Sequence, residues 1–272
     1  KHDYIDSLSS RNAILKYNYE DLFILKIGVS YLRSVRNHSL RLNLETAGNI
    51  LQSASSMFGA NRNSDGQYTL FGIAFAQYAK FDVDYARHII LDDVNTLALH
   101  ASFGIACPYG KSKILPFEKR YFSGGANSLR GWGVREVGPG GYSGGDGRID
   151  FITHTGDMKL DMSAELRTKL FWKFSAAAFV DAGNIWRFND IDWGNKEDGD
   201  FFKQTKFHLS NFFRQLALGT GAGLRYDLDF LVLRLDWGVG LHLPFETTRK
   251  GFYNIDRFTR YQTLHFAIGY PF

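Results

Sequence analysis

The sequence predicts an all-β protein, a transmembrane antiparallel β-barrel, and three observations lead to that fold class. Long runs in which apolar and polar residues alternate recur along the whole chain, and a period of two indicates strands with two different faces. Short and long connections alternate between these runs, as they do in outer-membrane barrels. Mean hydropathy is −0.23, and no stretch of 18 apolar residues occurs. This excludes a transmembrane helix but not a barrel, whose apolar surface lies on alternate residues.

In chain order, the alternating runs predict about ten strands. They span residues 13–19, 23–35, 38–48, 72–90, 96–107, 158–174, 175–186, 214–229, 230–243 and 261–272. Tight links are expected at 36–37, 174–175 and 226–230, and the long connections cover 49–71, 108–157, 187–213 and 244–260. The short links therefore belong to the periplasmic end of the predicted barrel and the long ones to its outer end.

The clearest alternation covers residues 158–172. Its apolar face consists of Met158, Leu160, Met162, Ala164, Leu166, Leu170 and Trp172, and its polar face of Lys159, Asp161, Ser163, Glu165, Arg167 and Lys169. We expect the apolar face to lie against lipid and the polar face to line a water-filled lumen. The alternative is a soluble β-sandwich, whose strands are usually about five or six residues long. The runs instead have the length of a strand that crosses a bilayer, which needs roughly 9–11 residues.

The composition excludes several classes of function. The formal net charge of +4 is spread along the chain and forms no basic stripe, so nucleic-acid binding is not expected. Cys107 is the only cysteine, which excludes an intrachain disulfide framework. The chain starts at Lys1 without a methionine, so a processed or truncated N-terminus is expected.

Two local patterns resemble chemical sites, but their surroundings favour loops. Residues 141–145 match G-x-S-x-G, yet a nucleophile elbow needs a strand before it and a helix after it, and this segment is a glycine-rich connection. Residues 190–200 are acidic but lack the spacing of a calcium loop. The histidines lack metal-ligand spacing, and His100 and His242 fit a polar lumen lining. We therefore expect no enzyme activity, no metal and no cofactor.

Four segments resemble a known family. They are "PFEKRYFSGGANSLRGW…VGPG", "FVDAGNIW", "GTGAGLRYDLDFLVLRLDWG" and "FAIGYPF". Together they resemble the BamA/TamA family of outer-membrane β-barrel assembly factors, from about residue 71 onward and most specifically over 116–139. The resemblance implies that residues 1–272 form the C-terminal part of a barrel of about sixteen strands. It also implies that the long connection at 108–157 folds into the lumen, and that the first strands and the periplasmic domains lie outside this sequence.

The resemblance assigns a loop motif to Arg130, Gly131 and Trp132, where the family often has phenylalanine or tyrosine at the third position. The family pairs the arginine with an acid on the next strand and with an aspartate in a Phe-x-Asp-x-Gly pattern on the strand after that. These positions are matched by Glu165 and by Phe179, Asp181 and Gly183. The alternation independently places Glu165 and Asp181 on inward faces. A guanidinium inside a narrow pore needs such carboxylates.

The resemblance also implies a lateral gate at the last predicted strand, 261–272. Leu264, Phe266, Ile268, Tyr270 and Phe272 are expected on its outward face. Gly269 permits a kink, and Pro271 cannot donate to a ladder, so the seam with the first strand of the whole barrel should pair weakly there. An open seam offers an edge to a client strand. The end formed by Gly269, Tyr270, Pro271 and Phe272 resembles the sorting signal that clients carry.

The function implied is that of a factor that folds and inserts client β-barrels in the outer membrane of a Gram-negative-type envelope. The implied partners are outer-membrane lipids, client β-barrel proteins, periplasmic domains and accessory assembly subunits. Two alternatives stay open: a polypeptide translocator of the same family, and a passive diffusion porin, which belongs to a different class. A porin keeps its lumen open, so single-channel conductance would separate it from a barrel plugged by its own loop.

One inward face consists largely of glycine. Residues Gly219, Gly221 and Gly223 alternate with apolar residues in the run 216–228. Two interpretations are equally open: the inserted loop packs over these glycines, or the glycines ease the curvature of the barrel.

Overall fold

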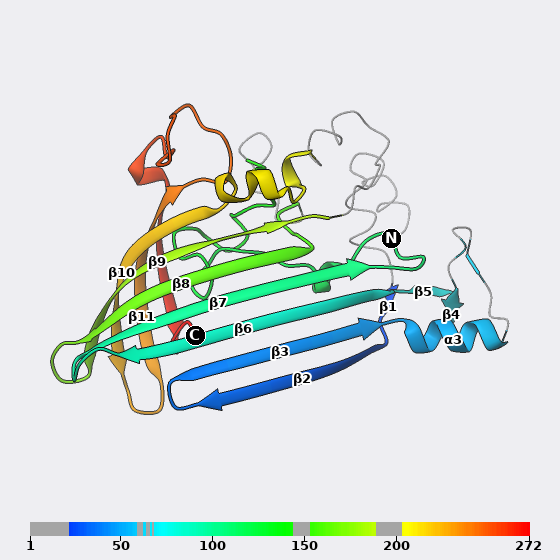
Figure 1. Ribbon diagram of the computed structural model, residues 1–272, viewed down its shortest axis with the longest axis horizontal. Helices are drawn as coiled ribbons and strands as arrows, with labels where there is room; N and C mark the ends of the chain where they lie inside the picture. The colour runs from blue at the N-terminus through cyan, green and yellow to red at the C-terminus, as the bar shows by residue number, and fades with distance from the viewer. Residues whose placement is uncertain (1–21, 59–61, 64–65, 67, 144–152, 189–202) are drawn as a thin grey trace.

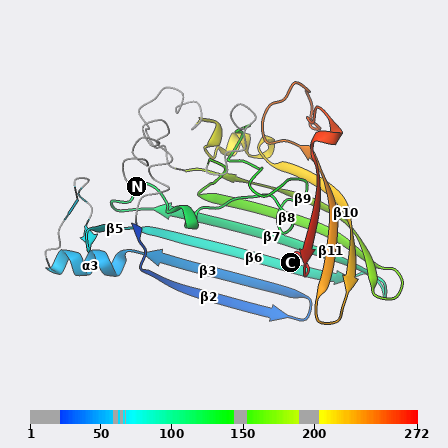
Figure 2. The same cartoon turned by 180° about the vertical axis from the view of Figure 1, so that it is seen from behind.

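The computed structural model describes residues 22–58, 62–63, 66, 68–143, 153–188 and 203–272. Its main body is a 9-stranded antiparallel sheet in which strands adjacent in the chain lie side by side. In spatial order these are β2 (Lys26–Val35), β3 (His38–Ala47), β6 (Tyr78–Ile90), β7 (Asn95–Pro108), β8 (Met158–Lys169), β9 (Phe174–Trp186), β10 (Ala217–Asp227), β11 (Val232–His242) and β12 (Gln262–Ile268). The sheet curves into a trough, seen from its two sides in Figure 1 and Figure 2.

The predicted all-β antiparallel fold is confirmed, and each strand of the main sheet falls within or close to a predicted run. The run predicted at 13–19 lies outside the described residues. The sheet is open, because β2 and β12 form its two edges and do not pair with each other in the described part of the chain. Tight turns at one end and long connections at the other agree with the predicted alternation.

The predicted strand at 72–90 is wrong at its start. Residues Ile73–Phe75 form β5, which pairs with β1 (Leu22–Phe23) and β4 (Thr69–Leu70) in a separate 3-stranded sheet. The break follows from Gln77, whose backbone N–H donates to Ser112 Oγ at 2.8 Å and whose carbonyl accepts from Tyr109. Gln77 is therefore paired with the connection that follows β7.

The long connection predicted at 49–71 contains a helix, α3 (Asn49–Phe58), which the sequence analysis missed. Gly48 ends β3 in the left-handed region, with φ of 83°, and its carbonyl accepts the N–H of Gln52. Short 3₁₀ helices η1 (Phe117–Lys119), η2 (Leu209–Arg214) and η3 (Phe258–Arg260) lie in the other long connections. None of the helices in the described residues is long and apolar enough to cross a membrane.

The two faces of the sheet differ as the alternation predicts. On β8, Met162 and Leu166 are 37% and 41% exposed, whereas Asp161 and Glu165 are 5% and 0% exposed. Met158 departs from the prediction, because it is buried opposite Trp186, whose ring packs against Phe207 and Phe212. The polar inner face of β8 is buried because the connection after β7 packs on it.

The core lies between this inner face and the connection after β7, which we call the inner loop (residues 109–143). One hydrophobic cluster joins Leu115 and Tyr121 of the loop to Tyr78, Ala106 and Ile185 of the sheet. A second joins Leu129, Trp132 and Val137 of the loop to Ala217 and Leu243. The loop is therefore part of the folded core and is held against the middle of the trough (Figure 1).

Candidate functional site

The inner loop turns back on itself before the chain reaches β8. Ser123 and Val137 form an antiparallel bridge, and the N–H of Gly125 donates to the carbonyl of Trp132 at 3.0 Å. Gly124 and Gly125 have φ of 97° and 100°, a left-handed conformation that glycine adopts without a steric penalty. Residues 126–131 therefore form a tight tip that projects Arg130 toward the wall.

Polar contacts fix both sides of this tip to the sheet. Ser128 Oγ donates to Asp161 Oδ2 at 2.6 Å, and Ser123 Oγ donates to Asp161 Oδ1 at 3.1 Å. On the opposite side, Arg234 Nη2 donates to Asn127 Oδ1 at 2.6 Å. The tip is thus tied to β8 and to β11 at once, and its orientation does not depend on Arg130 alone.

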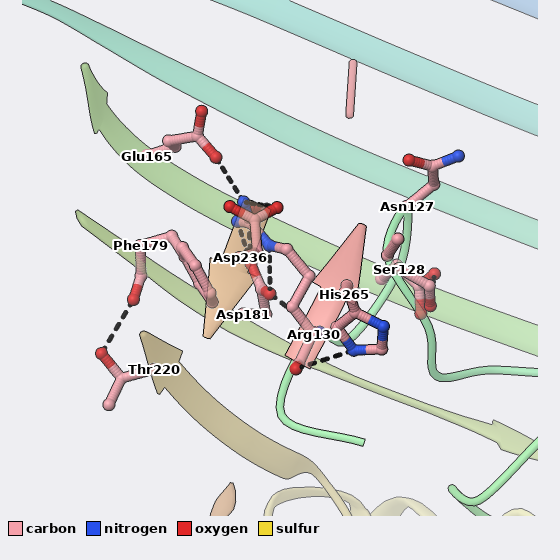
Figure 3. Close-up of polar contacts among 12 residues, drawn as sticks. Asn127, Ser128, Arg130, Glu165, Phe179, Asp181, Thr220, Asp236 and His265 are labelled. Atoms are coloured by element: carbon pink, nitrogen blue, oxygen red, sulfur yellow. Dashed lines mark hydrogen bonds and ion pairs between the residues drawn. The ribbon is translucent and has the colours of Figure 1, made fainter. Parts of the chain in front are cut away.

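Arg130 is fully buried between loop and wall, and Figure 3 shows its contacts. Its Nε and Nη2 donate to the two oxygens of Asp181, each at 2.8 Å, in a bidentate fork. Nη1 donates to Glu165 Oε2, and Nη2 also lies 3.1 Å from Ser163 Oγ. The guanidinium stacks 3.5 Å from the centre of the Phe179 ring. The contact predicted between Arg130 and these two carboxylates is present, and we call Arg130, Glu165 and Asp181 the anchor.

The charge of Arg130 is stabilised in this site. Burial alone would lower its pKa, but hydrogen bonding and charge attraction from Asp181 and Glu165 outweigh burial and raise the pKa above its ordinary value. The backbone N–H of Arg130 also donates to Asp181 Oδ2 at 3.0 Å. The site therefore recognises the backbone of the loop as well as its cation.

A wider group of charges surrounds the anchor, and the sequence analysis assigned it no role. Arg225 Nη2 donates to Glu165 Oε2 at 3.1 Å and its Nη1 donates to Asp236 Oδ1 at 2.5 Å. Arg234 Nε forms an ion pair with Asp236 Oδ2 at 3.1 Å, and Arg167 Nε donates to Glu165 Oε1 at 2.7 Å. The inward parity of these positions was readable from sequence, but their pairing depends on the register of β10 and β11.

Trp132 and the backbone of residues 130–131 occupy a surface without side chains on β10 and β11. A Cβ at Gly219 would lie 3.0 Å from the Trp132 ring, and a Cβ at Gly240 would lie equally close to it. A Cβ at Gly238 would collide with the Arg130 carbonyl. These glycines on two neighbouring strands therefore let the loop approach the wall at backbone distance.

The contacts of these glycines support the first interpretation of the glycine face at one position only. The loop covers Gly219, as the first interpretation predicts. The space above Gly221 is filled by the Phe179 ring, and the space above Gly223 by the side chains of Arg225 and Asp236. A Cβ at Gly183 would meet the Leu160 carbonyl and Asp161 on β8, and not the loop.

The residues predicted for the gate lie as expected along β12 but differently after the strand ends. Leu264, Phe266 and Ile268 on β12 are between 66% and 68% exposed, on the outward face as predicted. The strand ends at Ile268, and Gly269 has φ of 86°, which breaks the alternation. The outward position predicted for Tyr270 and Phe272 is therefore wrong: Arg167, an inward residue, lies 4.4 Å from the Tyr270 ring centre and 5.4 Å from that of Phe272.

The described residues hold no cluster of three or more His, Cys, Asp or Glu side chains suited to a metal ion. The charged groups of the site are instead paired with one another across the loop and the wall. The arrangement is suited to holding a loop in one position, and its contacts are all noncovalent.

Comparison with known proteins identifies the relatives of this chain. Residues 6–272 match the family model described as the Omp85 superfamily domain. The chain is 34% identical over 96 residues to the outer membrane protein assembly factor BamA of Neisseria meningitidis serogroup B, over 34% of this chain and 12% of that protein. The fold resembles the crystal structure of BamA from Haemophilus ducreyi lacking POTRA domains 1–3, with a TM-score of 0.54 and 17% identity.

That match covers 90% of this chain and 42% of the solved chain. CdiB from Escherichia coli also matches, with a TM-score of 0.50 and 14% identity, over 89% of this chain and 35% of CdiB. The chain therefore spans less than half the length of these relatives.

Proposed function

The chain belongs to the Omp85 superfamily, an outer-membrane β-barrel family, and from this membership we propose that it is the barrel region of an assembly factor that folds and inserts client β-barrels. The relative in Neisseria meningitidis, which carries the name of such a factor, supports the proposal. Residues 1–272 would supply the C-terminal part of the barrel, with 108–157 as its inserted loop. The remaining strands and the periplasmic domains would come from the rest of the protein.

The observation that carries the proposal is the buried anchor. A diffusion porin needs an open passage, whereas here the inner loop packs on the inner face of the central strands and brings a fully buried arginine onto two wall carboxylates. Burying charges is costly unless they are paired, and pairing favours one position of the loop. A protein whose loop is so specified is better suited to controlling its barrel wall than to passive conduction.

We further propose that clients enter through a gate at β12. This strand has 7 residues, pairs with β11 through Leu233↔Ile268 at one end, and stops at Gly269. A short edge strand leaves backbone donors and acceptors available to a new strand. Clients would add to this edge by strand pairing, with lipids, periplasmic domains and accessory subunits as further partners. The mechanism needs no cofactor and no covalent step.

The test uses the full-length protein in liposomes with cysteines that lock β12 to the first strand of the barrel. The free Cys107 is first replaced by serine. Insertion of an unfolded client barrel should stop in the oxidised protein and return on reduction. A matched control disulfide joins Val83→Cys and Phe103→Cys, which are paired on β6 and β7 inside the sheet. Undiminished insertion by the β12-locked form would exclude the gate, and a steady open conductance would favour a porin.

A further inference from the structure

The last strand contacts the backbone of the anchor directly. Thr263 Oγ1 donates to the carbonyl of Arg130 at 2.5 Å, and His265 Nε2 lies 3.2 Å from the same oxygen. Both residues face inward on β12, and Thr263 is paired with Gly238 of β11. Because Gly238 has no side chain, the Arg130 carbonyl reaches the seam between β11 and β12.

A second contact begins where β12 ends. The N–H of Gly269 donates to the carbonyl of Val232 at 2.7 Å, and the chain then turns inward. The Phe272 ring stacks on His100 of β7, with centroids 4.8 Å apart and planes 6° apart. Arg167 of β8 lies over the Tyr270 and Phe272 rings. Residues 270–272 thus tie β12 to the opposite part of the inner wall.

The two contacts converge on one carboxylate. Glu165 Oε2 accepts a hydrogen bond from Arg130, and Glu165 Oε1 accepts one from Arg167 at 2.7 Å. The flat face that Arg167 offers to the aromatic rings is therefore oriented by the residue that holds the loop. In the described part of the chain, Nη2 of Arg167 is buried without a hydrogen-bond partner, so Glu165 is the polar group that fixes this guanidinium.

We propose that Thr263 and His265 are positioning residues that couple the anchor to β12, the proposed gate strand, and that Arg167 holds the segment after β12. While Arg130 occupies its site, its carbonyl holds the inner face of β12, and Glu165 directs Arg167 onto the segment after β12. When Arg130 withdraws, β12 loses the carbonyl, whereas Arg167 keeps its bond to Glu165. Release of the loop and loosening of β12 against β11 are then one event. This inference deepens the proposed function, because it rests on β12 acting as the gate.

Two spin labels on the lipid side of the seam test the coupling. Leu235→Cys and Phe266→Cys are cross-strand partners on the exposed face, in a Cys107→Ser background of the full-length protein. Dipolar broadening reports the paired seam, and its loss reports separation. Thr263→Val with His265→Ala should raise the separated population about three- to tenfold, the factor expected from losing one or two hydrogen bonds. Arg167→Ala should raise it by a similar factor.

Controls separate coupling from general loosening. Lys169→Ala removes a neighbouring inward cation of β8 that does not touch the segment after β12, and should leave the broadening unchanged. Arg167→Lys keeps the charge without the flat guanidinium and should behave like Arg167→Ala; it also replaces that variant if Arg167→Ala does not fold. In an Arg130→Ala background, the Thr263 and His265 changes should add little, because the opened tip has already carried its carbonyl away from β12, whereas Arg167→Ala should keep its effect.

An unchanged spectrum in the Thr263 and His265 variants overturns the coupling, whatever the insertion rates are. A β12 strand that loosens as expected without any change in client insertion leaves the coupling in place and refutes β12 as the gate strand instead. The failure of this inference and the failure of the proposed function are therefore distinguishable.

Discussion

Replacing Arg130 by lysine separates the geometry of the anchor from its charge. Arg130 makes a two-bond fork with Asp181, a further bond to Glu165 and a stack on Phe179. A lysine keeps the charge but has a single nitrogen, so it loses one bond of the fork and the stacking contact. A hydrogen bond to a charged group contributes about 1.5–3 kcal/mol, so we expect the loop tip to be destabilised by about 2–3 kcal/mol.

Arg130→Ala is expected to be more severe. It leaves buried carboxylates without their cation, which costs on the order of 3–5 kcal/mol when the site stays dry, and less when water enters. Since a tenfold change corresponds to about 1.4 kcal/mol, the open population of the tip should rise roughly 30- to 150-fold in Arg130→Lys. It should rise by at least about 150-fold in Arg130→Ala if the site remains dry.

Hydrogen exchange measures this opening directly, because amides in a locally opened segment exchange in proportion to its open population. The reporting amides are those of Gly125, Ser128, Arg130 and Trp132, all hydrogen-bonded in the closed tip. Peptides from β6 and β7 serve as the internal control. Wild-type protection of the tip in Arg130→Lys would refute the geometric role, and wild-type protection in Arg130→Ala would refute the anchor itself.

Three further changes should have local and measurable effects. Gly238→Ala adds a methyl group that collides with the Arg130 carbonyl. Because overpacking costs about 1–3 kcal/mol, tip protection should fall about 5- to 150-fold, whereas Gly28→Ala on β2 should leave the tip unchanged. Gly269→Val places a β-branched residue at φ of 86°, which disfavours the inward turn. Residues 270–272 should then leave Arg167, and NMR should show the loss of the Phe272 ring contacts. Hydrogen bonds from Asn95 and Val94 hold the pKa of Asp92 below its ordinary value. The stability that Asp92 adds to the β6–β7 turn is therefore present above the ordinary pKa and is lost as pH falls through the lowered pKa. Asn95→Ala should move the NMR titration midpoint of Asp92 upward.

Much of the fold was predictable because alternation is a local property. The runs that became β8, β10 and β11 carry their inward and outward residues at fixed parity, and no distant contact is needed to recognise them. The break at Gln77 was not predictable, because it depends on pairing with residues 109–112, far away in sequence. The same holds for Tyr270 and Phe272, whose direction is set by one backbone angle at Gly269.

The residues of the site likewise divide into those that local patterns predict and those that depend on distant contacts. Arg130, Glu165 and Asp181 were found through motif resemblance and parity together. Arg225 and Asp236 carry the same inward parity, but their partnership requires the register in which Gly223 lies opposite Asp236 and Arg225 opposite Arg234. Parity gives the face on which a side chain lies, and register decides which side chain it meets.

The charges of the wall explain how such an anchor can release. Around the site, the wall supplies the carboxylates Glu165, Asp181 and Asp236 and the arginines Arg167, Arg225 and Arg234. These balance one another without Arg130. When the loop leaves, Glu165 keeps Arg167 and Arg225, and Asp236 keeps Arg225 and Arg234.

Asp181 is different, because Arg130 is its only arginine partner in the described residues, and Ser163 Oγ, at 2.7 Å, is what remains to it. The unfavourable electrostatic energy of the released state therefore falls mainly on one carboxylate. Neutralising that carboxylate in an Arg130→Ala background should relieve most of the damage, whereas neutralising Glu165 there should leave Arg167 without its carboxylate and Arg225 with Asp236 alone, and should deepen the damage. In a wall that is already neutral without the loop, the electrostatic cost of release falls mainly on one ion pair, and this is the property that an anchor needs if it is to open and close repeatedly.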